Sequence, residues 1–461
     1  MKYIRSIIFI SFLVISNISN GALSEASYLK AKTWKTKSGI PVYFVKETSL
    51  PIIDLDIIFA AGSAFDGELY GLSSMTTSLI GTKTRKLNED EIIDQINDLG
   101  TMINSSNDRD SLTLSLRTLT TDQYLSPSIE LYTQILNDSV FDEKIFNRIK
   151  NQYITSIKLD NQSPSDIAYK SFYKALYGNH PYAHPVNGTE ESISEITLSK
   201  VRKFYRNYLV KNNAVITMVG NLTEAQAKSL AEEITEQLPQ GQKPKPIPEP
   251  APPKDDQIIH IPFPSFQTTI LIGTLGIPKG SSKFYPLTVG NQYLGGSGLD
   301  SLLFDEVRKK RGLAYGAYSN LSTLKKKGTF IISTQTRNEK VIETISVIRD
   351  SVEAFLNNGV PSKNLDRAKK YITGSFPLSL ASNRNKSALL GLIAFYQLPL
   401  DYFDTYTNYI NQVINKEIIA DFDILLEGQK LITVTVGSTP EIEDQVVEQQ
   451  TEVIINEEPN S

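Results

Sequence analysis

The chain contains few residues that could bind a metal or act as a nucleophile. It has three histidines, His180, His184 and His260, and no cysteine. His180 and His184 are four residues apart, a spacing that on a helix would turn both imidazoles toward one metal ion. Each is followed directly by a proline, which predicts a loop over NHPYAHP. No third ligand at a fitting spacing accompanies the pair, so a zinc site here is the weaker interpretation.

A second group of residues could bind a carbonyl or carboxylate oxygen. Residues 295–315 read GGSGLDSLLFDEVRKKRGLAY and contain Arg308 and Tyr315. A guanidinium donates several hydrogen bonds from a fixed charge, and a phenol can donate to an oxyanion. The glycines do not form a G-x-G-x-x-G phosphate loop. Taken alone, the pattern favours Arg308 on a solvated helix face and Tyr315 in the core, because charge runs are usually solvated.

The elements that position these residues fall into two halves. Residues 241–254, GQKPKPIPEPAPPK, contain six prolines among fourteen residues. Such a run cannot form a helix or a central strand and predicts an extended linker. We therefore predict an N-terminal domain over residues 28–240 and a C-terminal domain over residues 255–440. A length of 461 residues agrees with at least two domains.

The two halves resemble each other. ITMVGNLT, which begins at Ile216, is repeated as ITVTVGSTP at Ile432, an offset of 216 residues. NRIKNQYITSI around Arg148 and DRAKKYITGSF around Arg367 repeat at an offset of 219. β-branched runs alternate with amphipathic stretches in each half, which predicts two duplicated α/β sandwich domains and an α+β fold class. The pattern leaves the strand directions open.

The ends of the chain differ from its body. Lys2 and Arg5 precede residues 7–15, which are apolar except for one serine, and small residues follow. This order is typical of a signal peptide, which we place at residues 1–22, and it predicts export. Residues 441–461 carry seven acidic side chains and no basic one, which predicts a disordered acidic tail. No later apolar stretch is long enough to span a membrane. The sequence also shows no basic face that would indicate nucleic-acid binding.

Residues 295–315 resemble the second-domain signature of the pitrilysin/insulinase metallopeptidase family. That signature is a glycine-rich turn, a helix ending in E-x-R, and then K-R-G-L-A-Y, and its most specific part here is residues 306–315. In the family, an arginine and a tyrosine seven residues later face the zinc site and hold the substrate backbone and the developing oxyanion. The resemblance implies that Arg308 and Tyr315 have this role and that the two domains close as a clamshell.

The zinc motif of the family is not preserved in the first half. Residues 71–82, GLSSMTTSLIGT, lie where the family has H-x-x-E-H, which supplies two histidine ligands and a glutamate base. The matching positions are Ser74, Thr77 and Ser78, which are neither competent zinc ligands nor a carboxylate base. The segment is also two residues shorter than the usual pattern.

The third zinc ligand of the family, a glutamate on a later helix, is missing as well. It would fall near Thr155 or Ser156. The resemblance therefore implies that this chain binds no metal or other cofactor itself. Any zinc is expected in a homologous partner subunit.

Some bacterial members of this family work as two different subunits, one with the zinc motif and one with the arginine and tyrosine. The resemblance implies that this chain is the second kind, exported to the bacterial periplasm and inactive alone. It would close a peptide-binding chamber and supply Arg308 and Tyr315 in trans to the zinc-bearing peptidase subunit. The alternative is a non-enzymatic peptide-binding or scaffold protein with the same fold. An unrelated hydrolase has little support, since no G-x-S-x-G motif occurs.

Overall fold

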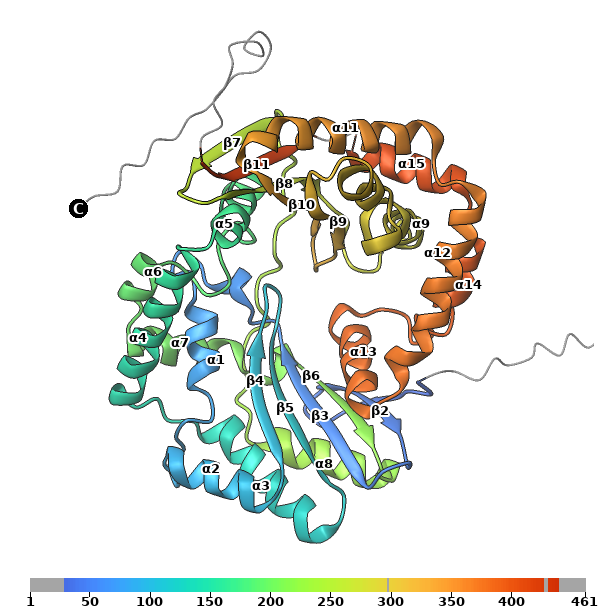
Figure 1. Cartoon of the computed structure of the whole chain (residues 1–461). Helices are drawn as coiled ribbons and strands as arrows, with labels where there is room; N and C mark the ends of the chain where they lie inside the picture. The colour runs from blue at the N-terminus through green and yellow to red at the C-terminus, as the bar shows by residue number, and fades with distance from the viewer. Residues whose placement is uncertain (1–28, 297, 427–429, 439–461) are drawn as a thin grey trace, which may run out of the picture.

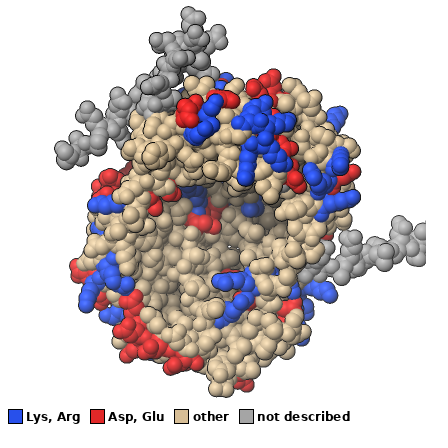
Figure 2. Space-filling model, viewed as in Figure 1, with Lys and Arg blue, Asp and Glu red and all other residues tan. Residues whose placement is uncertain are grey.

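The computed structural model describes residues 29–296, 298–426 and 430–438, so the predicted signal peptide and acidic tail lie outside the described residues. Two halves, residues 29–240 and 255–438, each contain one β-sheet with helices on its outer side (Figure 1). The inner faces of the sheets look toward a central hollow, whose visible wall is mostly uncharged (Figure 2). The predicted α+β clamshell is therefore confirmed.

The first sheet has six strands. Its order is β1 (Lys32–Lys35), β2 (Pro41–Lys46), β6 (Ala214–Gly220), β3 (Ile52–Phe59), β5 (Leu112–Leu119) and β4 (Met102–Asn107). Only the β2–β6 pair is parallel, and the other neighbours are antiparallel. Residues of β5 alternate between buried and half-buried, and those of β4 alternate between exposed and half-buried, as expected for strands with one face against a helix layer.

The second sheet has five strands. Its order is β7 (Gln257–Pro262), β11 (Ile432–Gly437), β8 (Gln267–Leu275), β10 (Thr329–Arg337) and β9 (Ala314–Ser322). Here too one pair, β7–β11, is parallel and the others are antiparallel. Strand order, direction and chain order match those of β2, β6, β3, β5 and β4 in the first sheet. The predicted duplication is visible in the topology, and the repeated ITMVG and ITVTV segments are β6 and β11.

Helices cover the outer side of each sheet. In the first half they are α1 (Leu72–Leu79), α2 (Glu89–Asp98), α3 (Asp122–Asp138), α4 (Glu143–Asp160), α6 (Glu190–Glu195), α7 (Leu198–Tyr208) and α8 (Glu224–Glu236). In the second half they are α9 (Phe284–Asn291), α10 (Leu302–Phe304), α11 (Val341–Asn358), α12 (Ser362–Ser375), α14 (Tyr406–Gln412) and α15 (Asn415–Leu426). Helix α8 illustrates how the sequence determines where such a helix begins and which of its faces is buried. Thr223 and Gln226 form a capping box at its start, and Ala227, Leu230 and Ile234 form its buried stripe.

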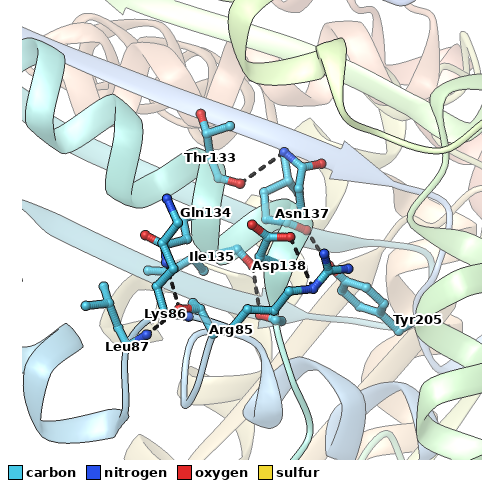
Figure 3. A network of polar contacts seen from close by, with 12 residues as sticks. Arg85, Lys86, Leu87, Thr133, Gln134, Ile135, Asn137, Asp138 and Tyr205 are labelled. Atoms are coloured by element: carbon cyan, nitrogen blue, oxygen red, sulfur yellow. Dashed lines mark hydrogen bonds and ion pairs between the residues drawn. The ribbon is translucent and has the colours of Figure 1, made fainter.

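Polar contacts also tie the outer helices of the first half together (Figure 3). Arg85, in the loop before α2, lies 3.7 Å from Asp138 at the end of α3. The Tyr205 hydroxyl of α7 donates to the carbonyl of Leu136. The Asn137 amide donates to the carbonyl of Thr133, one turn earlier in α3. The first two contacts tie α3 to the loop before α2 and to α7, and the third lies within α3.

Two helices cross between the halves. Helix α5 (Pro164–Tyr177) belongs to the first half but packs on the second sheet, where Phe172 is fully buried beside Leu271 and Val434. Helix α13 (Asn383–Tyr396) belongs to the second half but packs on the first sheet. A Cβ atom on Gly391 of α13 would lie 3.2 Å from Ile58 Cδ1 of β3. Each half therefore covers part of the inner face of the other.

The halves also meet at Asp110, in the turn between β4 and β5. Its carboxylate accepts hydrogen bonds from the Tyr182 hydroxyl, from the Tyr396 hydroxyl at 2.9 Å and from the backbone N–H of Lys325 at 2.8 Å. These donors come from the loop after α5, from α13 and from the turn between β9 and β10. Burial raises the pKa of Asp110.

The proline-rich segment, residues 241–254, forms neither helix nor strand. Its Ile247 is buried in the same cluster as α5 and β8, so the segment lies against the body of the protein. Within the described residues, every helix is too short or too polar to cross a bilayer.

Candidate functional site

Helix α1 occupies the place where the sequence predicts a degenerate zinc motif. All its residues except Ser78 are buried, and Gly71, in a left-handed conformation (φ 89°), precedes it. Ser74 and Ser78, four residues apart, both project polar atoms toward neighbouring elements. The Ser74 hydroxyl donates to the carbonyl of Val186 at 2.9 Å, and the Thr77 hydroxyl donates to the carbonyl of Ser73 at 2.8 Å. These side chains serve local structure.

Tyr153 of α4 is the residue that faces these serines. Its hydroxyl lies 2.8 Å from the Ser78 hydroxyl and 3.2 Å from the carbonyl of Ser74. Thr155 and Ser156, which the sequence analysis assigned to the third ligand position, are exposed on α4. The α4 residue that contacts α1 is therefore Tyr153, two to three positions before the residues predicted from the sequence.

The residues around α1 do not fit a zinc ion. The Asn107 amide donates to the Ser74 hydroxyl at 2.9 Å, so Asn107, Ser74, Ser78 and Tyr153 form a neutral network of amide and hydroxyl groups. Zinc sites in proteins use thiolate, imidazole or carboxylate ligands. Within the described parts of the chain, no group of three or more His, Asp or Glu side chains is placed to hold a metal.

His180 and His184 lie in a loop, as predicted, and both have structural partners. The backbone N–H of Tyr182 donates to Nδ1 of His180 at 3.1 Å, so the proton is on Nε2, which donates to the carbonyl of Pro248 at 2.9 Å. His180 thereby fastens the proline-rich segment to the first half. Burial lowers the pKa of His180.

The second histidine of this loop is stacked on a tyrosine. The rings of His184 and Tyr70 are nearly parallel with centroids 4.3 Å apart. Nδ1 of His184 donates to the carbonyl of Pro185 at 3.0 Å, and burial lowers its pKa. The third histidine, His260 of β7, contacts the Thr435 hydroxyl at 2.9 Å. The three imidazoles occupy separate packing sites.

Arg308 lies in a π-helical turn, Asp305–Lys309, that follows α10. It is exposed, and its guanidinium lies over the ring of Phe304 at 4.9 Å. The neighbouring cations are used differently, since Lys310 and Arg311 both pair with Glu306 at 2.5 Å. Among the described residues, Arg308 has no ion-pair partner. Its charge is available to a ligand.

Tyr315 lies at the start of β9 and is 80% exposed, so it is not a core residue. It lines a pocket of about 270 Å³ on the inner face of the second sheet. Arg308 is not among the residues of this pocket. The two residues are connected through the backbone, because the N–H of Leu313 donates to the carbonyl of Val307 at 2.9 Å.

The Tyr315 pocket includes residues that sequence reasoning missed. Tyr169 and Ser165 of α5 line it together with Tyr318 and Gln335 of the second half. None of its lining residues carries a charge. No signal in the sequence could have placed α5 here, because α5 belongs to the other half of the chain.

The fold and the altered metal motif agree with the comparisons to known proteins. Residues 44–190 match the model of the insulinase (peptidase M16) family, and residues 195–372 match that of the peptidase M16 inactive domain. A crystal structure of a peptidase M16 inactive domain from Pseudomonas fluorescens is 34% identical, covers 89% of this chain and 98% of its own, and has a TM-score of 0.86. The chain therefore belongs to the insulinase (M16) peptidase family.

Curated bacterial relatives are more distant. A non-peptidase homolog, YmxG, from Helicobacter pylori is 24% identical over 82% of this chain and 87% of its own length. An uncharacterized zinc protease, also named YmxG, from Bacillus subtilis is 24% identical over 78% and 87%. The relatives thus include both a protein named a zinc protease and one named a non-peptidase homolog, and the neutral network at α1 is consistent with a non-catalytic role for this chain.

Proposed function

We propose that this chain is the exported, zinc-less subunit of a two-subunit zinc metallopeptidase. It closes a peptide-binding chamber around the active site of a homologous, zinc-bearing partner in the bacterial periplasm. Arg308 and Tyr315 bind the substrate backbone and the developing oxyanion in trans. The chain cleaves no peptide alone.

The exposure of Tyr315 carries this proposal. A tyrosine that only filled a core would be buried, whereas this ring is 80% exposed at a pocket on the inner face of the second sheet. Its hydroxyl has no hydrogen-bond partner among the described residues. A phenol held on a strand with its hydroxyl free is suited to donate to a peptide oxygen.

Arg308 supports the same role. It is exposed and without an ion pair in the described part of the chain, while Lys310 and Arg311 beside it are paired. A guanidinium offers two or more donors to a carbonyl or carboxylate oxygen. The zinc and the general base would come from the partner, because Ser74, Thr77 and Ser78 can supply neither.

The experiment reconstitutes this chain with its zinc-bearing M16 partner. The partner is obtained by co-purification of the native complex. Arg308→Ala and Tyr315→Phe should leave complex formation and melting nearly unchanged, because both side chains are exposed. Peptide hydrolysis by the reconstituted pair should fall about 10²–10³-fold, the usual effect of removing one oxyanion donor.

Two matched controls separate this effect from general damage. Tyr371→Phe changes a tyrosine on α12 that is 63% exposed, and Lys309→Ala removes the cation next to Arg308. Both should hydrolyse peptide at the wild-type rate. Wild-type hydrolysis by Arg308→Ala and Tyr315→Phe would refute the in-trans role and favour a scaffold protein, whereas a lowered melting temperature would indicate a packing role.

A further inference from the structure

The first half has a pocket that the proposed function does not use. It encloses about 410 Å³ between the inner face of the first sheet and helix α13. Its place matches that of the Tyr315 pocket, which lies between the second sheet and α5. The two pockets differ in charge. Asp54, Asp56 and Asp108 line the first-half pocket with Arg117 and Arg384, whereas the other has no charged lining residue.

One of these carboxylates is already neutralised. Asp54 and Arg117 are direct neighbours in the register of β3 and β5. The Arg117 Nε atom lies 2.7 Å from Asp54 Oδ1, and its Nη2 atom lies 2.9 Å from Oδ2. This bidentate pair satisfies both groups. Neither is available to a ligand without breaking the pair.

Asp56 has no such cation. It lies two residues along β3 on the same face, and its register neighbour on β5 is Ser115. The Ser387 hydroxyl of α13 donates to Asp56 Oδ2 at 2.6 Å. Asp56 makes no ion pair with any described residue, and desolvation by burial raises its pKa despite the hydroxyl donors and the charge of Arg384. A cation brought to this carboxylate would relieve that cost.

The rest of the pocket fits an aliphatic stem. Ile58 of β3 and Leu392 and Phe395 of α13 line it beside Asp56. Lysine and arginine side chains combine such a stem with a cationic head. A bare metal ion or a purely polar ligand would leave these apolar walls unused.

We propose that this pocket binds a lysine or arginine side chain of a peptide held in the chamber. The cationic head group contacts Asp56, and the stem lies against Ile58 and Leu392. This inference rests on the peptide binding of the proposed function and assigns a chemical class to the peptide. The preference for a basic residue comes from the first half, because the equivalent pocket in the second half is neutral.

The test measures peptide binding by the isolated chain, without the partner. Two short fluorescent peptides, acetylated and amidated at their ends, differ only in a central lysine or norleucine, which has the same stem without the charge. By fluorescence anisotropy, the wild-type chain should bind the lysine peptide roughly tenfold tighter, as expected for one hydrogen bond to a charged group. Asp56→Asn should bring the two affinities close together.

A second variant covers the case in which Asp56→Asn does not fold. Ala388 is exposed on α13 and lines the pocket, so Ala388→Lys introduces a competing cation at a helical position that tolerates lysine. It should also abolish the preference. The control, Asp366→Asn, changes an exposed carboxylate on α12 and should keep it.

Equal affinities of the two peptides for the wild-type chain would overturn this inference, and so would no binding of either peptide. A preference that survives in the variants that fold would also overturn it. The outcome is separable from that of the proposed function. Reconstituted proteolysis that depends on Arg308 and Tyr315, with no lysine preference, would remove only this inference. A lysine preference with no effect of Arg308 or Tyr315 would remove only the proposed function.

Discussion

Lowering the pH through the range in which histidines ordinarily titrate should weaken the folded state, because His180 and His184 are buried as neutral rings. Burial lowers the pKa of both. The unfolded chain therefore binds more protons than the folded chain once the pH falls below about 6.5, the ordinary histidine value. The stabilisation is complete above that pH and is lost as the pH falls toward the folded-state values.

The size of the effect follows from linkage. A histidine that stays neutral in the folded protein lowers the free energy of unfolding by at most about 1.3 kcal/mol between pH 7 and pH 5.5. The pair therefore lowers it by at most about 2.5 kcal/mol. Three carboxyl groups act in the opposite direction, since burial raises the pKa of Asp56, Asp66 and Asp110. The quantity to measure is therefore the pH-dependent change in the free energy of unfolding, compared between the wild-type chain and a chain without the two imidazoles.

The assay compares the wild-type chain with the His180→Gln/His184→Gln double variant by urea unfolding at pH 7 and pH 5.5. Glutamine at position 180 can still donate to the carbonyl of Pro248, so the contact with the proline-rich segment is retained. On acidification, the free energy of unfolding of the wild-type chain should fall by up to about 2.5 kcal/mol more than that of the variant. With three histidines in the sequence, NMR can also follow each imidazole directly. Equal losses in both proteins, or titration of His180 and His184 at or above 6.5, would refute the reasoning.

Two further predictions concern metal and export. The purified chain should contain no stoichiometric zinc, because hydroxyl groups of Ser74, Thr77 and Ser78 stand in the ligand and base positions; elemental analysis near one zinc per chain would contradict this and direct attention to His180 and His184. The mature protein should begin between about residues 22 and 27, because a basic start, an apolar run and small residues form a signal peptide; N-terminal sequencing that finds an intact Met1 in cytosolic protein would exclude export.

Much of the architecture could be predicted from the sequence because one pair of duplicated segments forms core strands and the other pair lies on helices α4 and α12. ITMVG and ITVTV form β6 and β11, whose residues are all buried. The prolines after His180 and His184 also predicted their loop correctly. Apolar strand patterns and prolines act locally, so their effect does not depend on what the rest of the chain does.

Side-chain direction was harder to predict. The third ligand position was predicted at Thr155 or Ser156, which are both exposed, whereas Tyr153 is the α4 residue that contacts α1. Residues two apart on a helix point to nearly opposite sides, so a shift of two positions from Tyr153 to Thr155 leads away from α1. Tyr315 taken alone fitted a core tyrosine, and the structure leaves it 80% exposed. Whether the inner face of a strand is covered depends on distant elements, which the local pattern of β9 does not contain.

The exchange of α5 and α13 explains why the division of the chain into two halves is incomplete. The proline-rich segment separates the two sheets along the sequence, but Phe172 of α5 fills the core of the second sheet, and Leu390 of α13 packs with Val219 of the first. Either half alone would expose an apolar sheet face and an apolar helix, a combination that promotes association. Each inner-face pocket is likewise built from both halves, Asp56 with Ser387 in one and Tyr315 with Tyr169 in the other. The two pockets therefore depend on the duplicated chain remaining in one piece.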